Sequence, residues 1–252
     1  VPTRELAIQI EKQIEGLSYF VSVGSIAIYG GGGGKEWAVQ KDAIDAGVDI
    51  IVATPGKLIS HLKLGYVKLD KLRHLVLDEA DRMLDMGFQK TIEAIIDAVP
   101  SQRQTLLFSA TYPKGIKAIA ETIMQNPSIA EVAPTQDTVR VDQAFFLVDN
   151  EKDRLQSLKL LLLDNRGKQC VVFCNTRQDC MDLARSLQND GFDAIELHGE
   201  LEQRDRDLTL VKFANGSCPI LVATDMAARG LDIKDLAAVV NYELPYDPEI
   251  YV

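Results

Sequence analysis

Neighbouring carboxylates in an acidic tetrapeptide are the clearest chemical feature of the sequence. Asp78, Glu79 and Asp81 directly follow a short hydrophobic run, His74–Leu77, in the order Asp-Glu-Ala-Asp. At the end of a buried strand, the first carboxylate can hold Mg²⁺ through its water shell, and the second can orient or deprotonate a water that attacks a phosphate. The same acidic groups could simply favour the start of a helix, whose dipole attracts negative charge. The tetrapeptide therefore predicts a phosphoryl-transfer site with Asp78 and Glu79 facing the metal.

The hydrophobic pattern around this tetrapeptide predicts that strands and helices alternate along the chain. Short apolar runs rich in β-branched residues recur, as in strands buried on both faces, and longer amphipathic stretches separate them. The expected strands are Ile26–Tyr29, Asp49–Ala53, His74–Leu77, Thr105–Phe108, Cys170–Cys174, Ala194–Leu197, Ile220–Ala223 and Ala238–Asn241. The clearest helical patterns are Pro113–Met124, Lys152–Leu163, Asp179–Gln188 and Glu202–Phe213. This alternation predicts an α/β fold with parallel sheets, and the length allows two domains.

Polar residues follow most of the expected strands, at the edge where ligands bind in open parallel α/β sheets. Besides the carboxylates, the segments at these strand ends contain Thr54, Pro55, Gly56, Ser109, Thr111, Asn175 and Thr224. Local structure offers a second explanation for several candidates. Thr54-Pro55-Gly56 can form a turn and a helix start, Thr224 can cap a helix, and Arg206 can pair with acids on its own helix. His198 fits a structural role at the turn of Gly199 better than a metal site.

The motifs together resemble those of a known family. In chain order they are Pro2-Thr3-Arg4, Thr54-Pro55-Gly56, Asp78-Glu79-Ala80-Asp81, Ser109-Ala110-Thr111, Gln203-Arg204-Asp205-Arg206 and Ala228-Arg229-Gly230-Leu231-Asp232. This order resembles the DEAD-box family of ATP-dependent RNA helicases (superfamily 2), and residues 197–232 look most like its bacterial DbpA branch. The resemblance implies two tandem RecA-like domains, each a parallel β-sheet flanked by helices and each truncated. We place them at residues 1–134 and 143–252, with a linker at 135–142.

The resemblance also implies roles for individual residues, with ATP and Mg²⁺ as cofactors and RNA as the partner. Asp78 would serve Mg²⁺ and Glu79 the hydrolytic water. Asp81, Ser109 and Thr111 would couple the nucleotide state to domain closure. Gly230 and Asp232 match positions beside the nucleotide ribose. The positions that match residues facing the RNA backbone are Thr3, Arg4, Gly31, Thr54, Pro55, Gly56, Asn175, Gln203, Arg206 and Thr224.

The sequence departs from the family pattern at three points. No phosphate-binding loop is present, because in Gly30–Gly34 followed by Lys35 the required first glycine falls at Tyr29 and the required Ser or Thr at Glu36. Gly30 and Gly31 instead resemble the paired glycines of the family, in a loop that we expect to be flexible. Lys57 stands where the family usually has arginine, which removes a bidentate donor. The arginine fingers are also missing, so we expect a piece of a longer protein that hydrolyses ATP poorly by itself.

Composition limits the partners and the location. The formal net charge of −10 opposes an extended basic surface for nucleic acid, although hydroxyls, backbone amides and a few arginines suffice to hold phosphates. The sequence has no apolar run of about 18 residues, and its four cysteines lack metal-site spacing. We expect a cytoplasmic monomer that unwinds short RNA duplexes, with ribosomal RNA and ribosome assembly as the setting. A non-catalytic RNA clamp or scaffold and a DNA-directed helicase are the alternatives.

Overall fold

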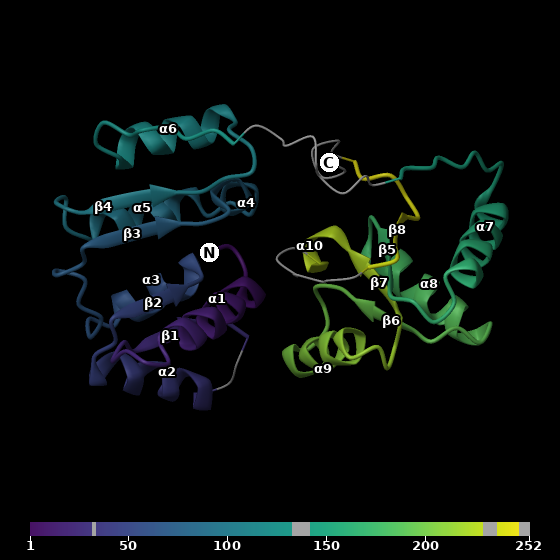
Figure 1. The fold of residues 1–252 in the computed structure, drawn as a ribbon, viewed down its shortest axis with the longest axis horizontal. Coiled ribbons are helices and arrows are strands. Elements are labelled where there is room, and N and C mark those ends of the chain that lie inside the picture. Colours follow the sequence, from purple (N-terminus) through teal and green to yellow (C-terminus); the bar gives the residue numbers. More distant parts are fainter. Residues whose placement is uncertain (32–33, 133–141, 229–235, 247–252) are drawn as a thin grey trace. The chain divides into compact units, whose positions relative to one another are not determined.

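The computed structural model describes residues 1–31, 34–132, 142–228 and 236–246. The chain divides into two compact units, Val1–Ala133 (unit 1) and Pro134–Val252 (unit 2), which are described separately (Figure 1). The predicted linker at 135–142 lies outside the described residues except for Asp142. Each unit contains parallel strands and helices, which confirms the α/β prediction.

Unit 1 contains two short parallel sheets. β1 (Ser25–Ile28) pairs with β2 (Ile50–Ala53), and β3 (His74–Leu77) pairs with β4 (Gln104–Leu107). The helices are α1 (Arg4–Leu17), α2 (Gly34–Ala46), α3 (Pro55–Lys63), α4 (Ala80–Asp85), α5 (Gln89–Asp97) and α6 (Lys114–Ile123). Helices α4, α5 and α6 pack apolar side chains, including Met83, Ile92 and Ile116, against the end of β3. The strand ends that carry polar motifs are thus fixed by helices on a hydrophobic core.

The strands of unit 1 are less buried than the sequence predicts. Val76 in β3 is 49% exposed and Leu106 in β4 is 39% exposed. A cavity of about 1100 Å³ lies between β2 and β3, and residues of both strands line it. The prediction that these strands are buried on both faces is therefore wrong, because this cavity separates β2 from β3 in the part of the chain that the structure describes.

Unit 2 has one four-stranded parallel sheet in the order β6-β7-β5-β8. Its strands are β5 (Cys170–Cys174), β6 (Ala194–Leu197), β7 (Ile220–Thr224) and β8 (Ala238–Asn241). Its helices are α7 (Glu151–Asp164), α8 (Arg177–Asn189), α9 (Gln203–Ala214) and α10 (Asp225–Ala228). Central strands β5 and β7 are almost entirely buried, as expected for a parallel sheet covered on both faces.

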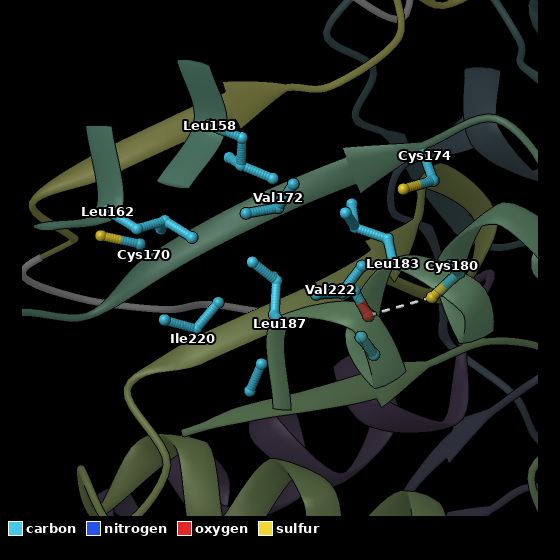
Figure 2. Close-up of a cluster of buried hydrophobic side chains, with 12 residues drawn as sticks. Leu158, Leu162, Cys170, Val172, Cys174, Cys180, Leu183, Leu187, Ile220 and Val222 are labelled. Carbon is cyan, nitrogen blue, oxygen red and sulfur yellow. Dashed lines mark hydrogen bonds between the residues drawn. The ribbon is translucent and has the colours of Figure 1, made fainter. Parts of the chain in front are cut away.

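Alternating side chains of β5 divide the core of unit 2 between the two faces of the sheet. Val172 packs with Leu158 of α7 and Leu187 of α8 on one face, as Figure 2 shows. Val171 packs on the opposite face with Phe213 of α9. This period of two, combined with helices on both faces, rigidly fixes the carboxyl ends of β5 and β7.

The four cysteines are free thiols buried in unit 2. The Cys180 thiol donates to the carbonyl oxygen of Val222, with Sγ and O 3.1 Å apart (Figure 2). Burial raises the pKa of Cys180 to about 11 and that of Cys174 well above its usual range. Among the described residues, no group of three or more His, Cys, Asp or Glu side chains could hold a metal ion. The cysteines therefore act as small apolar core residues.

Candidate functional site

The acidic tetrapeptide forms a tight turn from β3 into α4. Glu79 has φ 50° and ψ 52°, in the left-handed region that residues with a Cβ seldom adopt. The Ala80 amide donates to the carbonyl oxygen of Phe108, 3.0 Å away, just beyond the end of β4. This cross-strand bond helps to hold the unusual Glu79 backbone, and such strained residues cluster at functional sites.

Asp81 joins the tetrapeptide to the polar segment after β4. Its Oδ2 accepts hydrogen bonds from both the amide and the hydroxyl of Thr111, each 2.9 Å long. Its Oδ1 accepts from the Arg82 amide, 3.0 Å away. The Ser109 hydroxyl donates to the Thr111 carbonyl oxygen, 2.6 Å away. The structure therefore brings Asp81, Ser109 and Thr111 together across 30 residues of sequence.

The carboxylates of this turn differ in their electrostatics. Burial and then the negative charge of Asp78 raise the pKa of Glu79. Burial opposes ionisation of Asp81 as well, but hydrogen bonds from Thr111 and Arg82 outweigh it, and the pKa of Asp81 is lowered. Asp81 is thus an anion satisfied by fixed donors, whereas Asp78 and Glu79 repel each other. Oxygen ligands whose charges repel fit Mg²⁺, because a divalent cation would relieve that repulsion.

The start of the chain lies beside the ends of β1 and β2. The Val1 amino group donates to the carbonyl oxygen of Ala53, 3.0 Å away. Thr3 is the N-cap of α1, and its hydroxyl accepts from the Leu6 amide at 3.2 Å. The Arg4 guanidinium lies over the Tyr29 ring, 4.6 Å from its centroid. Thr3 thus has a structural role in capping, and Arg4 is held against an aromatic ring next to the glycine-rich loop.

Thr54, Pro55 and Gly56 form the start of α3, as the local interpretation of this motif predicted. Pro55 occupies the first turn, and the Thr54 side chain makes no capping hydrogen bond. The Thr54 amide donates to the Ile28 carbonyl oxygen at 2.9 Å, which ties the motif to the end of β1. Gly31, in the loop after β1, has φ 101° and so requires glycine. Pro55 has no N–H, and the amides of Lys57 and Leu58 donate to the Thr54 carbonyl oxygen, so the Gly56 amide is the first-turn donor that suits a phosphate oxygen.

In unit 2, the predicted residues Asn175 and Thr224 lie at neighbouring strand ends. Cys174 pairs in register with Thr224, so Asn175 follows directly beside it. The Asn175 amide donates to Glu243 Oε2 at 3.1 Å, and its side-chain Nδ2 donates to the Leu244 carbonyl oxygen at 2.9 Å. The segment after β8 therefore fixes Asn175, a contact between residues 68 positions apart.

Helix α9 positions the other two predicted residues of unit 2. Gln203 Nε2 donates to Asp207 Oδ1 at 2.8 Å, and Arg206 donates to the Ala227 carbonyl oxygen of α10 at 2.6 Å. Arg206 thus links α9 to the segment after Thr224. His198 is 3% exposed, and its Nδ1 accepts from the Glu200 amide at 3.4 Å, which agrees with the structural role that the sequence suggested.

The structure groups the predicted residues into sets within each unit. In unit 1 one set surrounds Asp81, and the other lies around the starts of α1 and α3; unit 2 contributes a set at the ends of β5 and β7. Gly230 and Asp232 lie outside the described residues. Sequence reasoning did not identify Tyr29 and Glu243, which hold Arg4 and Asn175. Their partners are distant in sequence, so no local motif could have revealed them.

Two family models match the chain. The family described as DEAD/DEAH box helicase matches residues 1–119, and the family described as helicase conserved C-terminal domain matches residues 153–252. The chain belongs to the DEAD-box helicases, which confirms the resemblance drawn from its motifs.

Individual relatives of the chain are named as RNA helicases. It is 48% identical to "ATP-dependent RNA helicase DbpA" of Escherichia coli (strain K12), over 100% of this chain and 54% of that protein. It is 41% identical to "ATP-dependent RNA helicase CshA" of Listeria monocytogenes, over 100% of this chain and 48% of that protein. The chain thus spans about half the length of the curated relatives that it matches.

Solved structures show the same fold. The structure titled "S. cerevisiae Dbp5 bound to RNA and ADP BeF3" matches with a TM-score of 0.85 and 28% identity, over 98% of this chain and 62% of that chain. A DEAD box protein from Methanococcus jannaschii matches with a TM-score of 0.51 and 37% identity, over 100% of this chain and 67% of that chain. These neighbours are DEAD-box proteins, so the strands and helices described above form RecA-like domains.

Proposed function

We propose that the full-length natural protein carrying this chain is an ATP-dependent RNA helicase that opens short RNA duplexes. The observation that carries this proposal is the pair of hydrogen bonds from Thr111 to Asp81, next to the strained Glu79 backbone. We call this pair of bonds the joint between Asp81 and Thr111. This joint connects the carboxylate turn after β3 to the segment after β4, so a change at one strand end is transmitted to the other. The domains that we propose are residues 1–134 and 143–252, joined by a linker at 135–142.

In this proposal, Asp78 would hold Mg²⁺ through its water shell, and Glu79 would orient the water that attacks the terminal phosphate of ATP. Mg²⁺, when bound, neutralises charge that develops on the phosphate oxygens. Gly230 and Asp232 contact the nucleotide. Asp81, Ser109 and Thr111 couple the nucleotide state to domain closure. The sequence of this chain contains neither a phosphate-binding loop nor the arginine fingers of the family, so we propose that this chain alone hydrolyses ATP poorly.

In this proposal, the protein binds RNA through the RNA backbone, both as a single strand and as a short duplex. The residues in this role are Thr3, Arg4, Gly31, Thr54, Pro55, Gly56, Asn175, Gln203, Arg206 and Thr224. Backbone amides and hydroxyls dominate this set, and such contacts position a strand without reading its sequence. The predominance of neutral donors is compatible with the net charge of −10.

The wider setting that we propose is ribosome assembly, with ribosomal RNA as the substrate and the protein acting as a cytoplasmic monomer. This setting comes from the resemblance to the DbpA branch, and the chain is 48% identical to a relative of that name over its whole length. Within the described residues, no helix combines the length and the apolar character needed to span a bilayer.

The decisive test is a Glu79→Gln substitution in the full-length protein. The variant should lose RNA-stimulated ATP hydrolysis and should retain binding of ATP and RNA, because Gln keeps the shape of Glu but cannot accept a proton from water. Preserved turnover would remove Glu79 from its role. ATPase stimulation by RNA and by DNA, measured side by side, separates an RNA helicase from a DNA helicase. A full-length protein that binds RNA but shows no ATPase activity would be a clamp or scaffold.

A further inference from the structure

A stack of aromatic and cationic side chains lies next to the predicted RNA-backbone residues of unit 1. The indole of Trp37, on α2, stacks on the imidazole of His61, on α3, with ring centroids 3.9 Å apart and planes 7° apart. The Lys57 ammonium, one helical turn before His61 on α3, lies 4.1 Å from the centroid of the same indole. A cation at this distance from a tryptophan face is attracted by the quadrupole of the neutral ring, whose face is electron-rich. Trp37 therefore contacts both Lys57 and the base of the stack.

Buried hydrogen bonds anchor the base of this stack. His61 is fully buried, and its Nε2 lies 3.1 Å from Oε1 of Gln40, which is 2% exposed. The hydroxyl of Tyr66 lies within hydrogen-bonding distance of Nδ1 on the same ring. Burial and then the positive charge of Lys57 lower the pKa of His61, so its ring is neutral at physiological pH. With Tyr66 donating to Nδ1, the Nε2–H donates to Gln40, and the imidazole cannot rotate without losing both bonds.

The location of the stack links it to the RNA set. Lys57 directly follows Thr54-Pro55-Gly56 at the start of α3, where the Gly56 amide can donate to a phosphate oxygen. Gln40 Nε2 also donates to the carbonyl oxygen of Tyr29, 3.4 Å away, and the Tyr29 ring lies under Arg4. Lys57 and Arg4 are thus each held over an aromatic ring, and Gln40 links the backbone of Tyr29 to the imidazole on which Trp37 stacks.

The stack also bears on a departure from the family pattern. Lysine at position 57 lacks the planar fork of arginine and has a flexible four-carbon stem, so it loses more rotamer freedom when it binds a phosphate. Contact with a fixed indole restricts that freedom before RNA binds. The side chain is then pre-organised, and pre-organisation increases affinity because less ordering remains to be done on binding.

We propose that Trp37 is a positioning residue that holds the Lys57 ammonium for contact with an RNA phosphate at the start of α3. The proposal rests on the proposed function, since it assumes that the protein binds RNA. Lys57 contacts the RNA and Trp37 acts through Lys57. Removal of Trp37 therefore removes part of the contribution that Lys57 makes to binding, and has no further effect once Lys57 is absent.

A double-mutant cycle in the full-length protein tests this proposal. The variants are Trp37→Leu, Lys57→Gln and the double substitution, with Val39→Ala, at an exposed position on the same helix, as the control. The affinity for a short single-stranded RNA is measured over a range of salt concentrations, with the ATPase KM for RNA and kcat in parallel. Loss of the cation–π contact should weaken RNA binding about threefold to fivefold. Lys57→Gln should reduce the salt slope by about 0.7, as for one phosphate contact on a single strand.

Three results support the proposal together. Trp37→Leu should raise KM for RNA and leave kcat at saturating RNA unchanged, the double variant should bind no more weakly than Lys57→Gln, and Val39→Ala should match the wild type. The proposal is overturned if the two losses multiply, if Trp37→Leu leaves affinity unchanged or tightens it, or if Lys57→Gln leaves the salt slope unchanged. If the wild type itself binds no RNA, the proposed function fails first.

The folding of each variant is checked in a separate control. Circular dichroism and the unfolding midpoint identify a variant that is merely misfolded. If Trp37→Leu does not fold, Trp37→Phe replaces it in the same cycle. Phenylalanine keeps an aromatic face over His61 but attracts a cation more weakly, so its RNA affinity should lie between those of the wild type and Lys57→Gln. An affinity equal to that of the wild type would then overturn the proposal.

Discussion

The joint between Asp81 and Thr111 should contribute measurably to the stability of unit 1. Asp81 is 6% exposed and accepts three hydrogen bonds through its two oxygens. An Asp81→Asn side chain has one oxygen, so it can keep the two bonds from Thr111 only by turning its NH₂ group towards the Arg82 amide. A lost charge-assisted bond and an unsatisfied donor cost roughly 2–3 kcal/mol together. Thr111→Val removes only the exposed hydroxyl donor, and water can partly replace it, so its expected cost is about 1–2 kcal/mol.

Urea unfolding of this chain can measure these differences selectively. The chain has a single tryptophan, Trp37, which lies in unit 1, so its fluorescence reports the unfolding of that unit. The expected order of stability is wild type and Thr111→Ser highest, then Thr111→Val, then Asp81→Asn. Serine is the matched control because it keeps the hydroxyl. An Asp81→Asn variant as stable as Thr111→Ser would refute the reasoning.

The pH dependence gives a second check on the same joint. The pKa of Asp81 is lowered in the folded state, so the unfolded chain binds more protons as the pH falls. The stability that the carboxylate contributes is therefore complete above its unfolded pKa of about 3.9 and is lost as the pH falls through the lower folded value. The difference between wild type and Asp81→Asn should stay constant from neutral pH to about 5 and shrink below about 4.

Three further predictions concern the Ser109–Thr111 segment, His61 and Cys180. In the full-length protein, Ser109→Ala combined with Thr111→Ala should reduce RNA unwinding much more than ATP hydrolysis, because it disconnects the two strand ends; equal losses in both assays would indicate misfolding instead. The pKa of His61 is lowered by burial and by Lys57, so its contribution to stability should be complete above about pH 6.5 and decline as the pH falls below it. His61→Phe should flatten the decline of stability with falling pH, as measured by urea unfolding followed by Trp37 fluorescence. An unchanged pH profile in this variant would argue against a contribution from His61. Cys180, whose thiol pKa is about 11, should react with iodoacetamide only upon unfolding, and fast labelling of the native chain would contradict its burial.

The sequence by itself determined the class of fold and the identity of the candidate residues. Each expected strand differs from the observed one by at most one residue at either end, because the hydrophobic pattern is a local property of the chain. The Asp-Glu-Ala-Asp turn and Thr54-Pro55-Gly56 could be recognised for the same reason, since their chemistry depends on neighbouring residues. Both lie at the strand ends where the sequence predicted them.

Only the tertiary structure decided which of these residues meet and how tightly they are held. The bonds from Thr111 to Asp81 and from Asn175 to Glu243 join residues 30 and 68 positions apart, and hydrophobic periodicity carries no information on such pairings. The exposure of Val76 depends on the cavity beside β3, which the apolar run did not reveal. Asp-Glu-Ala-Asp thus specified the carboxylates in sequence, but only three-dimensional packing brought the amide and hydroxyl of Thr111 to Asp81.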